Sequence, residues 1–160
     1  MASESIIIYT DGAALGNPGP GGYGAVLMFG PHRKEISAGF RLTTNNRMEL
    51  LAVIEALRNI KVAGFSVEIY TDSKYVCDAI EKRWIFGWKA KGWKNVKNVD
   101  LWLQFLPLYE QFKPKFNWVK GHAGITENER CDYLATTAAQ SSPVDTDLEY
   151  EALKSGSQLF

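Results

Sequence analysis

Hydrophobic and polar residues follow one another along the chain in two rhythms, one typical of strands and one of helices. Short apolar or alternating runs predict five strands, which we place at residues 6–9, 23–29, 34–41, 67–70 and 116–119. Strands one to three follow each other closely and predict an antiparallel meander. The later strands are separated by helical patterns, which indicates a β-α-β unit and an α/β domain.

The helices are marked by apolar residues that return every three or four positions. They are predicted from residue 46 onward, through residues 75–80, over residues 99–112 and from residue 126 onward. Thr44 or Asn45 is the expected N-cap of the first helix. Thr126 and Glu129 have the spacing of a capping box and are expected to begin the last helix.

Length and composition favour one soluble domain. The chain has 160 residues, of which 46% are hydrophobic and 22% charged, as in ordinary globular proteins. No apolar run approaches the roughly 20 residues of a membrane span, and the first residues lack the pattern of a signal peptide, so we expect a cytoplasmic location without membrane contact. Cys77 and Cys131 are too few for a disulfide framework or a zinc site. Residues 1–140 are the expected domain, and residues 141–160 an acidic C-terminal tail.

Charge is distributed unevenly, although 18 basic and 18 acidic residues balance over the whole chain. Residues 1–140 carry a net charge of +3, and the tail is acidic. Residues 82–97, here called the basic segment, hold six basic side chains and no acidic one, with Trp84, Trp88 and Trp93 among them. This composition favours contact with a phosphate backbone. The alternative is that Trp84 and Trp88, one helical turn apart, belong to the core.

Glycines at residues 19–24 match the spacing of a dinucleotide-binding fingerprint. That motif requires a helix directly after its last glycine, so that the helix N-terminus holds the pyrophosphate. The residues that follow here have the pattern of a strand. A dinucleotide site is therefore not expected.

Four carboxylates occupy positions from which they can meet at one edge of the sheet. Asp11 and Asp72 each follow an apolar strand, and parallel neighbouring strands would place them side by side. Glu49 lies at the rim of the apolar face of the first helix, and Asp132 borders that of the last. Oxygen ligands of this kind suit Mg²⁺ or Mn²⁺ better than zinc. The alternative is that each aspartate only caps a turn.

His122 lies in a loop with glycine on either side, Gly121 and the nearby Gly124. An exposed histidine beside a metal site can carry protons, because its ordinary pKa is near neutrality. The alternative is an ordinary surface histidine.

Five segments closely resemble those of bacterial type 1 ribonuclease H, and they span residues 5–140 in matching order. They read Y-T-D-G-A-A-L-G-N-P-G-P-G-G-Y-G-A, T-T-N-N-R-M-E-L, T-D-S-K-Y-V, K-N-V-D-L-W and W-V-K-G-H-A-G-I-T-E-N-E-R-C-D-Y-L-A. The resemblance implies a ribonuclease H-like fold: a mixed five-stranded sheet, with strand two antiparallel, flanked by helices. It also implies a metal-dependent endoribonuclease that hydrolyses the RNA strand of RNA/DNA hybrids with little dependence on sequence.

Site residues carried over from the resemblance include the same four carboxylates, Asp11, Glu49, Asp72 and Asp132, as metal ligands and catalytic residues. The resemblance implies two Mg²⁺ ions, with Mn²⁺ as a substitute. One ion would activate a water for in-line attack and the other stabilise the leaving 3′ oxygen, leaving 5′-phosphate and 3′-hydroxyl ends. His122 would move a proton or help product release.

The expected contacts with the nucleic acid come from the turn after the first strand, the start of the first helix, the residue after Asp72 and the basic segment. They are Asn17, Thr44, Asn45, Asn46, Lys74, Trp84, Trp88, Lys89, Lys91, Lys94 and Asn98. Thr44 and Asn98 are expected to hold a phosphate of the DNA strand. Lys74 departs from the glutamine found in many relatives.

Two other functions remain open at this stage. A catalytically silent module that only binds hybrids would be expected to lack at least one carboxylate, whereas all four are present. Integrases and transposases share the carboxylate arrangement but need additional DNA-binding domains. We expect a monomer with no obligate protein partner. Opposite charge suggests that the tail docks on the basic segment.

Overall fold

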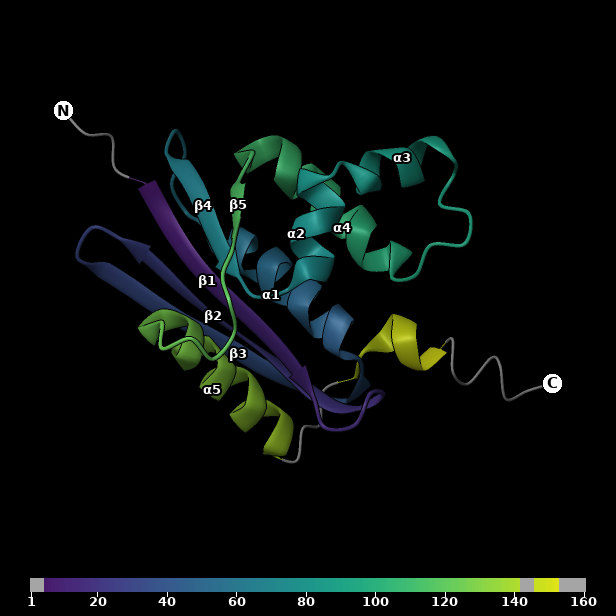
Figure 1. Cartoon of the computed structure of the whole chain (residues 1–160), viewed down its shortest axis with the longest axis horizontal. Helices are drawn as coiled ribbons and strands as arrows, with labels where there is room; N and C mark the ends of the chain where they lie inside the picture. Colours follow the sequence, from purple (N-terminus) through teal and green to yellow (C-terminus); the bar gives the residue numbers. More distant parts are fainter. Residues whose placement is uncertain (1–4, 142–145, 153–160) are drawn as a thin grey trace.

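The computed structural model describes residues 5–141 and 146–152, and these form one mixed sheet with helices on both faces (Figure 1). Its five strands run in the order β3-β2-β1-β4-β5. They are β1 (Ser5–Ala14), β2 (Gly19–Phe29), β3 (His32–Thr43), β4 (Ser66–Thr71) and β5 (Lys115–Trp118). β2 pairs antiparallel with β1 and β3, whereas β4 is parallel to both β1 and β5. The expected fold class is confirmed.

Helices cover the two faces unequally. They are α1 (Asn45–Arg58), α2 (Lys74–Glu81), α3 (Trp84–Ala90), α4 (Val99–Phe112) and α5 (Thr126–Gln140). α5 packs across β1, β2 and β3 on one face, while α1 packs on β1 and β2 from the other and is covered in turn by α4. No helix among the described residues is both long and apolar enough to cross a membrane.

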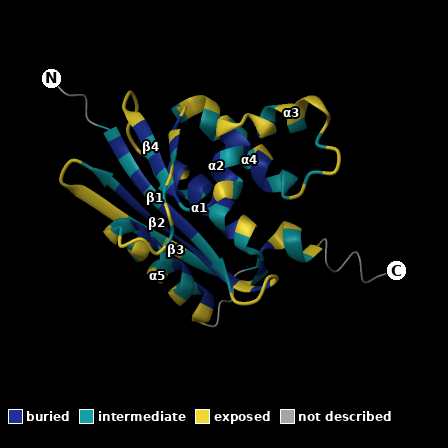
Figure 2. Ribbon diagram, viewed as in Figure 1, coloured by how far each residue is buried: buried dark blue, intermediate teal, exposed yellow. Residues whose placement is uncertain are grey.

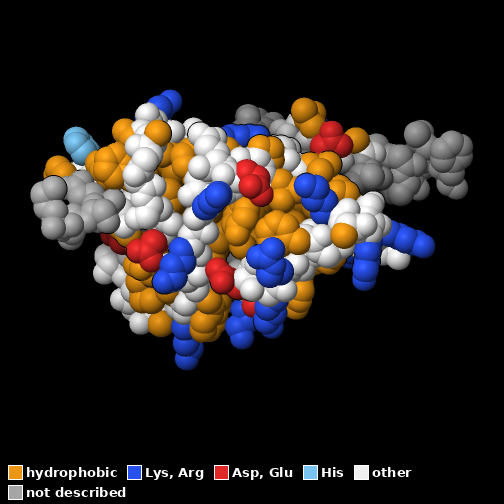
Figure 3. All heavy atoms as spheres, turned by 90° about the horizontal axis from the view of Figure 1, so that it is seen from above, with side chains coloured by type: hydrophobic (Ala, Val, Ile, Leu, Met, Phe, Trp, Pro, Cys, Tyr) orange, Lys and Arg blue, Asp and Glu red, His pale blue; other side chains and the backbone are white. Residues whose placement is uncertain are grey.

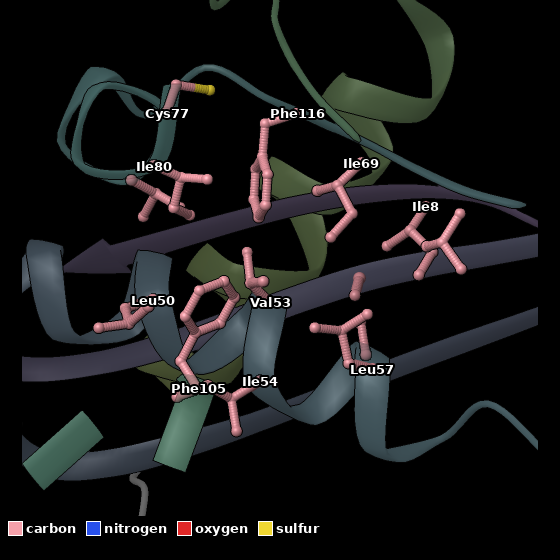
Figure 4. Close-up of a cluster of buried hydrophobic side chains, with 14 of the residues drawn as sticks. Ile8, Leu50, Val53, Ile54, Leu57, Ile69, Cys77, Ile80, Phe105 and Phe116 are labelled. Atoms are coloured by element: carbon pink, nitrogen blue, oxygen red, sulfur yellow. The ribbon is translucent and has the colours of Figure 1, made fainter. Parts of the chain in front are cut away.

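The main hydrophobic core lies between the sheet and α1, and α4 closes it from outside (Figure 4). Ile8 and Ile69 point into it from neighbouring strands, Leu50 and Ile54 from α1, and Phe105 from α4. Each of these side chains is completely or almost completely buried, and burial of one such side chain stabilises the fold by about 1.5–3 kcal/mol. Figure 2 shows the buried positions concentrated along the central strands and α1.

The glycine-rich stretch after the first apolar run belongs largely to the paired strands β1 and β2. β1 continues to Ala14, which pairs with Gly21, and β2 begins at Gly19, so only residues 15–18 connect the two strands. A Cβ atom on Gly12 would lie 2.4 Å from the backbone nitrogen of Glu49, and one on Gly24 would lie 2.7 Å from the carbonyl oxygen of Cys131. These glycines therefore let α1 and α5 approach the sheet.

Helix ends test two predictions from the sequence. Thr44 is the N-cap of α1, and its hydroxyl accepts a hydrogen bond from the Arg47 backbone N–H at 3.2 Å, so that prediction is confirmed. The capping box at the last helix is wrong. Ile125 is the N-cap of α5, Thr126 is already helical, and no side chain caps this end.

Candidate active site

The parallel pairing of β1 with β4 brings the first two carboxylates together. Thr10 stands opposite Thr71 in this ladder, so Asp11 and Asp72 follow adjacent positions on neighbouring strands. The predicted pairing of these strands is confirmed, with one difference. Asp11 lies within β1 rather than at its end, because the strand extends to Ala14 along β2.

Glu49 completes a compact group of acidic side chains. One carboxylate oxygen from each of Asp11, Glu49 and Asp72 lies within 4.8 Å of the others. The approach of Glu49 depends on Gly12, because any side chain there would collide with the backbone of α1. In the part of the chain that the structure describes, this group of three is the one that could hold a metal ion by this distance.

Burial shifts the protonation of this group strongly. Removal from water raises the pKa of Asp11 to about 7, opposed by a hydrogen bond with Glu49 and reinforced by the charge of Asp72. Burial and the adjacent Asp11 charge raise the pKa of Glu49 well above its ordinary value. The Oε2 atom of Glu49 is buried without a hydrogen-bond partner among the described residues. Such a site fits a divalent cation, which would supply the charge that these oxygens lack.

Asp132 and His122 face the same open cavity of about 400 Å³, which α5 and the loop after β5 close from one side. Burial raises the pKa of Asp72, and the charge of Asp132 adds to this, whereas a hydrogen bond with Asp11 and the charge of His122 lower it. Asp132 stands outside the compact group of three carboxylates. The cavity is lined by Asp11, Gly12, Ala13, Asn45, Asn46, Glu49, Asp72, Ser73, Lys74, Tyr75, His122 and Asp132.

The loop with His122 is attached to the sheet next to Asp72. The Val119 backbone N–H donates to the carbonyl of Thr71 at 2.9 Å, which continues the pairing of β4 with β5. A Cβ atom on Gly121 would lie 2.7 Å from an Asp72 carboxylate oxygen, so the loop backbone approaches that carboxylate closely. His122 itself adopts a left-handed conformation with φ of 56°.

Comparison with known proteins identifies the family. Residues 3–140 match the family model described as RNase H. The chain belongs to the RNase H family. It is 55% identical over 150 residues to a ribonuclease H of Desulforamulus reducens, covering 91% of this chain and 94% of the relative. It is 53% identical over 153 residues to one of Rippkaea orientalis, covering 92% and 93%.

Solved structures agree with this assignment. LC9-RNase H1, described as a type 1 RNase H with the type 2 active-site motif, matches with a TM-score of 0.78 at 33% identity, covering 95% of this chain and 82% of that one. LC11-RNase H1, solved in complex with an RNA/DNA hybrid, matches with a TM-score of 0.67 at 28% identity, covering 86% and 99%. The chain is thus a divalent-metal-dependent endoribonuclease of RNA/DNA hybrids, and its clustered carboxylates are the candidate metal site.

Three asparagines expected at the substrate interface are arranged around the turn between β1 and β2. The Asn45 side-chain oxygen accepts from the backbone N–H of Ala14 at 2.6 Å. The Asn17 side-chain oxygen accepts from the backbone N–H of Asn45 at 3.1 Å. These bonds tie the turn to the start of α1, and Asn46 lies beside both the acidic cavity and the next one along the surface.

A second cavity, of about 710 Å³, brings Thr44 and Asn98 together at the start of α1 and α4. The Asn98 side-chain amide donates to the Tyr75 hydroxyl at 3.0 Å, and its oxygen accepts from the Arg47 guanidinium at 3.3 Å. Asn98 is therefore held in place from two sides. We refer to this cavity as the α1–α4 pocket.

The basic segment divides between surface and core. Trp84 is 46% exposed, with the Lys82 ammonium 5.3 Å from its ring centre. Trp88 instead is half-buried and packs against Trp102 of the core, with ring centres 5.8 Å apart, so it contributes to the core and keeps part of its surface open to solvent. The lysines named from the sequence, Lys89, Lys91 and Lys94, are all exposed. Figure 3 shows Lys and Arg side chains projecting from one face of the molecule with hydrophobic side chains between them.

Two contacts near these sites were missed from the sequence. Arg47 is 2% exposed and pairs with Asp100 at 2.7 Å and with Asp147 at 2.8 Å. Its position three residues before the buried Leu50, on the apolar face of α1, was a usable signal for a buried arginine. Lys74 places its ammonium 5.0 Å from the Trp118 ring centre, and no sequence pattern indicated that pairing.

Proposed function

We propose that Asp11, Glu49, Asp72 and Asp132 hold two Mg²⁺ ions with which this chain hydrolyses the RNA strand of an RNA/DNA hybrid by in-line attack of water. The observation that carries the proposal is the group of three carboxylates within 4.8 Å, with one buried oxygen that lacks a partner among the described residues. When bound, the ions supply an activated water and stabilise the leaving 3′ oxygen. The expected products carry 5′-phosphate and 3′-hydroxyl ends.

The chain's own residues provide the geometry of this reaction. Asp11 and Asp72 are carried by adjacent parallel strands, and Glu49 by a helix packed on them, so the three oxygens are preorganised by the core. Asp132 reaches the same cavity from α5. Because the fold already holds like charges together, cation binding relieves their repulsion. Mn²⁺ is expected to substitute, since it accepts the same oxygen ligands.

His122 is proposed to move a proton near the leaving group or to help product release. It lines the acidic cavity from the loop after β5, whereas Asp11 and Asp72 are fixed to the sheet. A histidine can accept or donate a proton near neutral pH. Loss of His122 is therefore expected to slow the reaction, whereas loss of Asp11 is expected to nearly abolish it.

The substrate is proposed to lie across the acidic cavity and the α1–α4 pocket. Asn17, Asn45 and Asn46 would read sugars and base edges in the minor groove, where the 2′-hydroxyl distinguishes RNA from DNA. Thr44 and Asn98 would hold a phosphate of the DNA strand. Lys74 would add charge beside the scissile region, and the basic segment would bind DNA through Trp84, Trp88, Lys89, Lys91 and Lys94.

The remaining features of the proposal come from the sequence. We propose that residues 1–140 form the catalytic domain and residues 141–160 an acidic tail. The protein is proposed to act as a monomer in the cytoplasm, without an obligate protein partner. Sedimentation of the purified chain with and without hybrid would test the monomeric state.

Cleavage of end-labelled duplexes tests the reaction directly. The RNA strand of a hybrid should be cut in Mg²⁺, while RNA/RNA, DNA/DNA and single-stranded RNA stay intact and EDTA stops the reaction. Asp11→Asn should nearly abolish cleavage, and Glu110→Gln, which neutralises an exposed acid on α4, should leave it unchanged. Binding without cleavage in both Mg²⁺ and Mn²⁺ would refute the enzymatic proposal and favour a hybrid-binding module.

A further inference from the structure

The α1–α4 pocket has one wall that does not come from the domain proper. Thr44 and Asn98, proposed above to hold a DNA phosphate, line this cavity. Glu149 and Tyr150 of the C-terminal tail line it as well. The exposed Lys97, at the end of the basic segment, also contributes to the lining. The cavity proposed for an anionic group is therefore lined by an acidic residue of the tail, Glu149, in addition to Asp100 of α4.

This wall is anchored firmly by the residue two positions before Glu149. The Asp147 carboxylate is almost completely buried and accepts hydrogen bonds from Arg47 Nε at 2.8 Å and Nη2 at 2.9 Å. It also accepts from the Thr43 hydroxyl at 2.6 Å. On the other side of Glu149, the Glu151 carboxylate pairs with Arg41 at 2.9 Å. Residues 146–152 are thus held at two points that flank Glu149.

These contacts replace the docking site expected from charge alone. In the described part of the tail, residues 146–152, the ion pairs run to Arg41 on β3 and Arg47 on α1 rather than to the basic segment. Figure 1 shows this short helical turn beside the start of α1. For Arg47 the reason is geometric, because a buried arginine offers several fixed donors to one carboxylate, whereas exposed lysines offer a single mobile charge each.

Arg47 connects the tail to the pocket. The guanidinium that binds Asp147 also donates to the Asn98 side-chain oxygen at 3.3 Å and to both oxygens of Asp100, and it lies 5.7 Å from the centre of the Tyr150 ring. The position of the tail and the position of Asn98 are therefore set by the same side chain.

We propose that residues 146–152 form an acidic wall of the DNA-phosphate pocket and that Glu149 weakens hybrid binding there. The inference rests on the proposed function, because it needs a phosphate in the α1–α4 pocket. A carboxylate on the rim of this cavity repels that phosphate through partly hydrated space, so its effect is modest and decreases with salt. Glu149 of the tail thus weakens binding of the DNA strand, whereas the basic segment strengthens it.

Hybrid binding by full-length variants in the inactive Asp11→Asn background tests the proposal without cleavage. Glu149→Gln should bind an RNA/DNA hybrid about threefold more tightly at low ionic strength, and Glu149→Lys more tightly still. The gain should shrink as salt is raised. Glu110→Gln, which removes the same charge from an exposed site on α4, should bind like the parent. Glu149 is exposed, so thermal melting should show that all variants stay folded.

Uncharged linkages in the DNA strand can show which phosphate Glu149 repels. Methylphosphonate linkages are placed one at a time along the DNA strand, and each hybrid is measured with the parent and with Glu149→Gln. The gain from Glu149→Gln should disappear at the linkage that occupies the pocket and persist at distant ones. Equal gain at all positions, no gain, or weaker binding by Glu149→Gln would each overturn the proposal.

Failure of the proposed function would look different. If the intact chain neither cleaved the hybrid nor bound it in preference to duplex DNA, both the proposed function and this inference would fall. If cleavage were normal and Glu149→Gln bound like Glu110→Gln, only the role of Glu149 would be refuted.

Discussion

The acidic side chains of the active site lie where they can bind metal but reduce the stability of the metal-free protein. Asp11 and Glu49 are buried close to each other and to Asp72, and the pKa values of all three lie above their ordinary values. A buried carboxyl group that must ionise to bind metal destabilises the metal-free protein. The same groups that serve the reaction therefore lower the free energy of unfolding when no cation is present.

Neutralising Asp11 should reveal this destabilisation. The pKa of Asp11 is raised to about 7 from an ordinary 3.8, so its contribution to stability is present at low pH and is lost as pH rises through about 7. In EDTA, wild-type stability should fall relative to Asp11→Asn across this range, with a slope of up to about 1.4 kcal/mol per pH unit.

Urea unfolding at several pH values between about 4 and 8 measures this difference. Asp78→Asn, which neutralises a partly exposed acid on α2, serves as the control and should follow the wild type. A gap between wild type and Asp11→Asn that stayed constant with pH would contradict the assigned cause. Mg²⁺ should stabilise the wild type more than Asp11→Asn, because it binds the folded site.

Whole elements carry the site residues, and ion pairs join elements that are distant in sequence. Glu35 on β3 accepts hydrogen bonds from Arg130 on α5 at 2.8 and 2.9 Å and from Arg33 at 2.7 Å. Arg33 also pairs with Glu127 at 2.9 Å. This network fastens the first turns of α5, which precede Asp132, to the edge of the sheet.

Lowering the pH should weaken the ion pairs of Glu35 that join α5 to β3. Hydrogen bonds from Arg130 and then Arg33 lower the pKa of Glu35 to about 2 from an ordinary 4.5. Its contribution is therefore present above about pH 4.5 and lost as pH falls toward 2. The stability advantage of wild type over Glu35→Gln should shrink over that range in urea unfolding. Glu68→Gln on β4 is the control, and an advantage that persisted unchanged at about pH 2 would exclude this mechanism.

Loss of the hydrogen bonds that Asp147 of the tail makes should destabilise the whole fold. Asp147→Ala leaves the Thr43 hydroxyl and Arg47 Nε without their acceptor, whereas Arg47 Nη2 loses one of its two bonds and keeps Asp100. We expect the free energy of unfolding to fall by about 3 kcal/mol. Leu148→Ala, at a side chain 75% exposed, should change it by less than about 0.5 kcal/mol in the same assay.

At the scale of the whole molecule, balanced net charge conceals opposed surfaces. The basic segment includes α3 and the turn after it, whereas Asp147 in the described part of the acidic tail, residues 146–152, pairs with Arg47 at the start of α1. Exposed lysines that neutralise phosphates release counterions, which makes binding depend on salt. Affinity for a hybrid should therefore depend on which lysines lie at the binding surface and not on the net charge of the chain.

The salt dependence of hybrid binding tests whether the lysines of the basic segment contact phosphates. Replacing Lys89, Lys91 and Lys94 with alanine should reduce the slope of log affinity against log salt by up to about 0.9 for each phosphate that is no longer neutralised. The control replaces the equally exposed Lys34, Lys61 and Lys115. Equal changes of slope in the two triple variants would mean that the basic segment has no special role.

The local pattern of the sequence was enough to predict the five strands, the helix α1 and the approximate positions of three acidic site residues. Apolar runs predicted five strands, and Asp11 and Asp72, which each follow such a run, were expected side by side if their strands were parallel neighbours. The parallel pairing of β1 with β4 bears this out. Apolar residues at helical spacing predicted α1 and the buried side of Glu49. Strand and helix periods are properties of short segments, so they can be read without knowing the fold.

Tertiary structure decided what depends on segments that meet only after folding. Packing of α1 over Gly12 brought Glu49 within 4.8 Å of the aspartates. Asp132, carried by α5, stands outside that group. Packing of α3 against Trp102 of α4 separated exposed Trp84 from half-buried Trp88. Arg47 pairs with Asp100 and with Asp147, which lie 53 and 100 residues away in the sequence. Side-chain contacts across such distances follow from the shape of the packed core, which no local pattern contains.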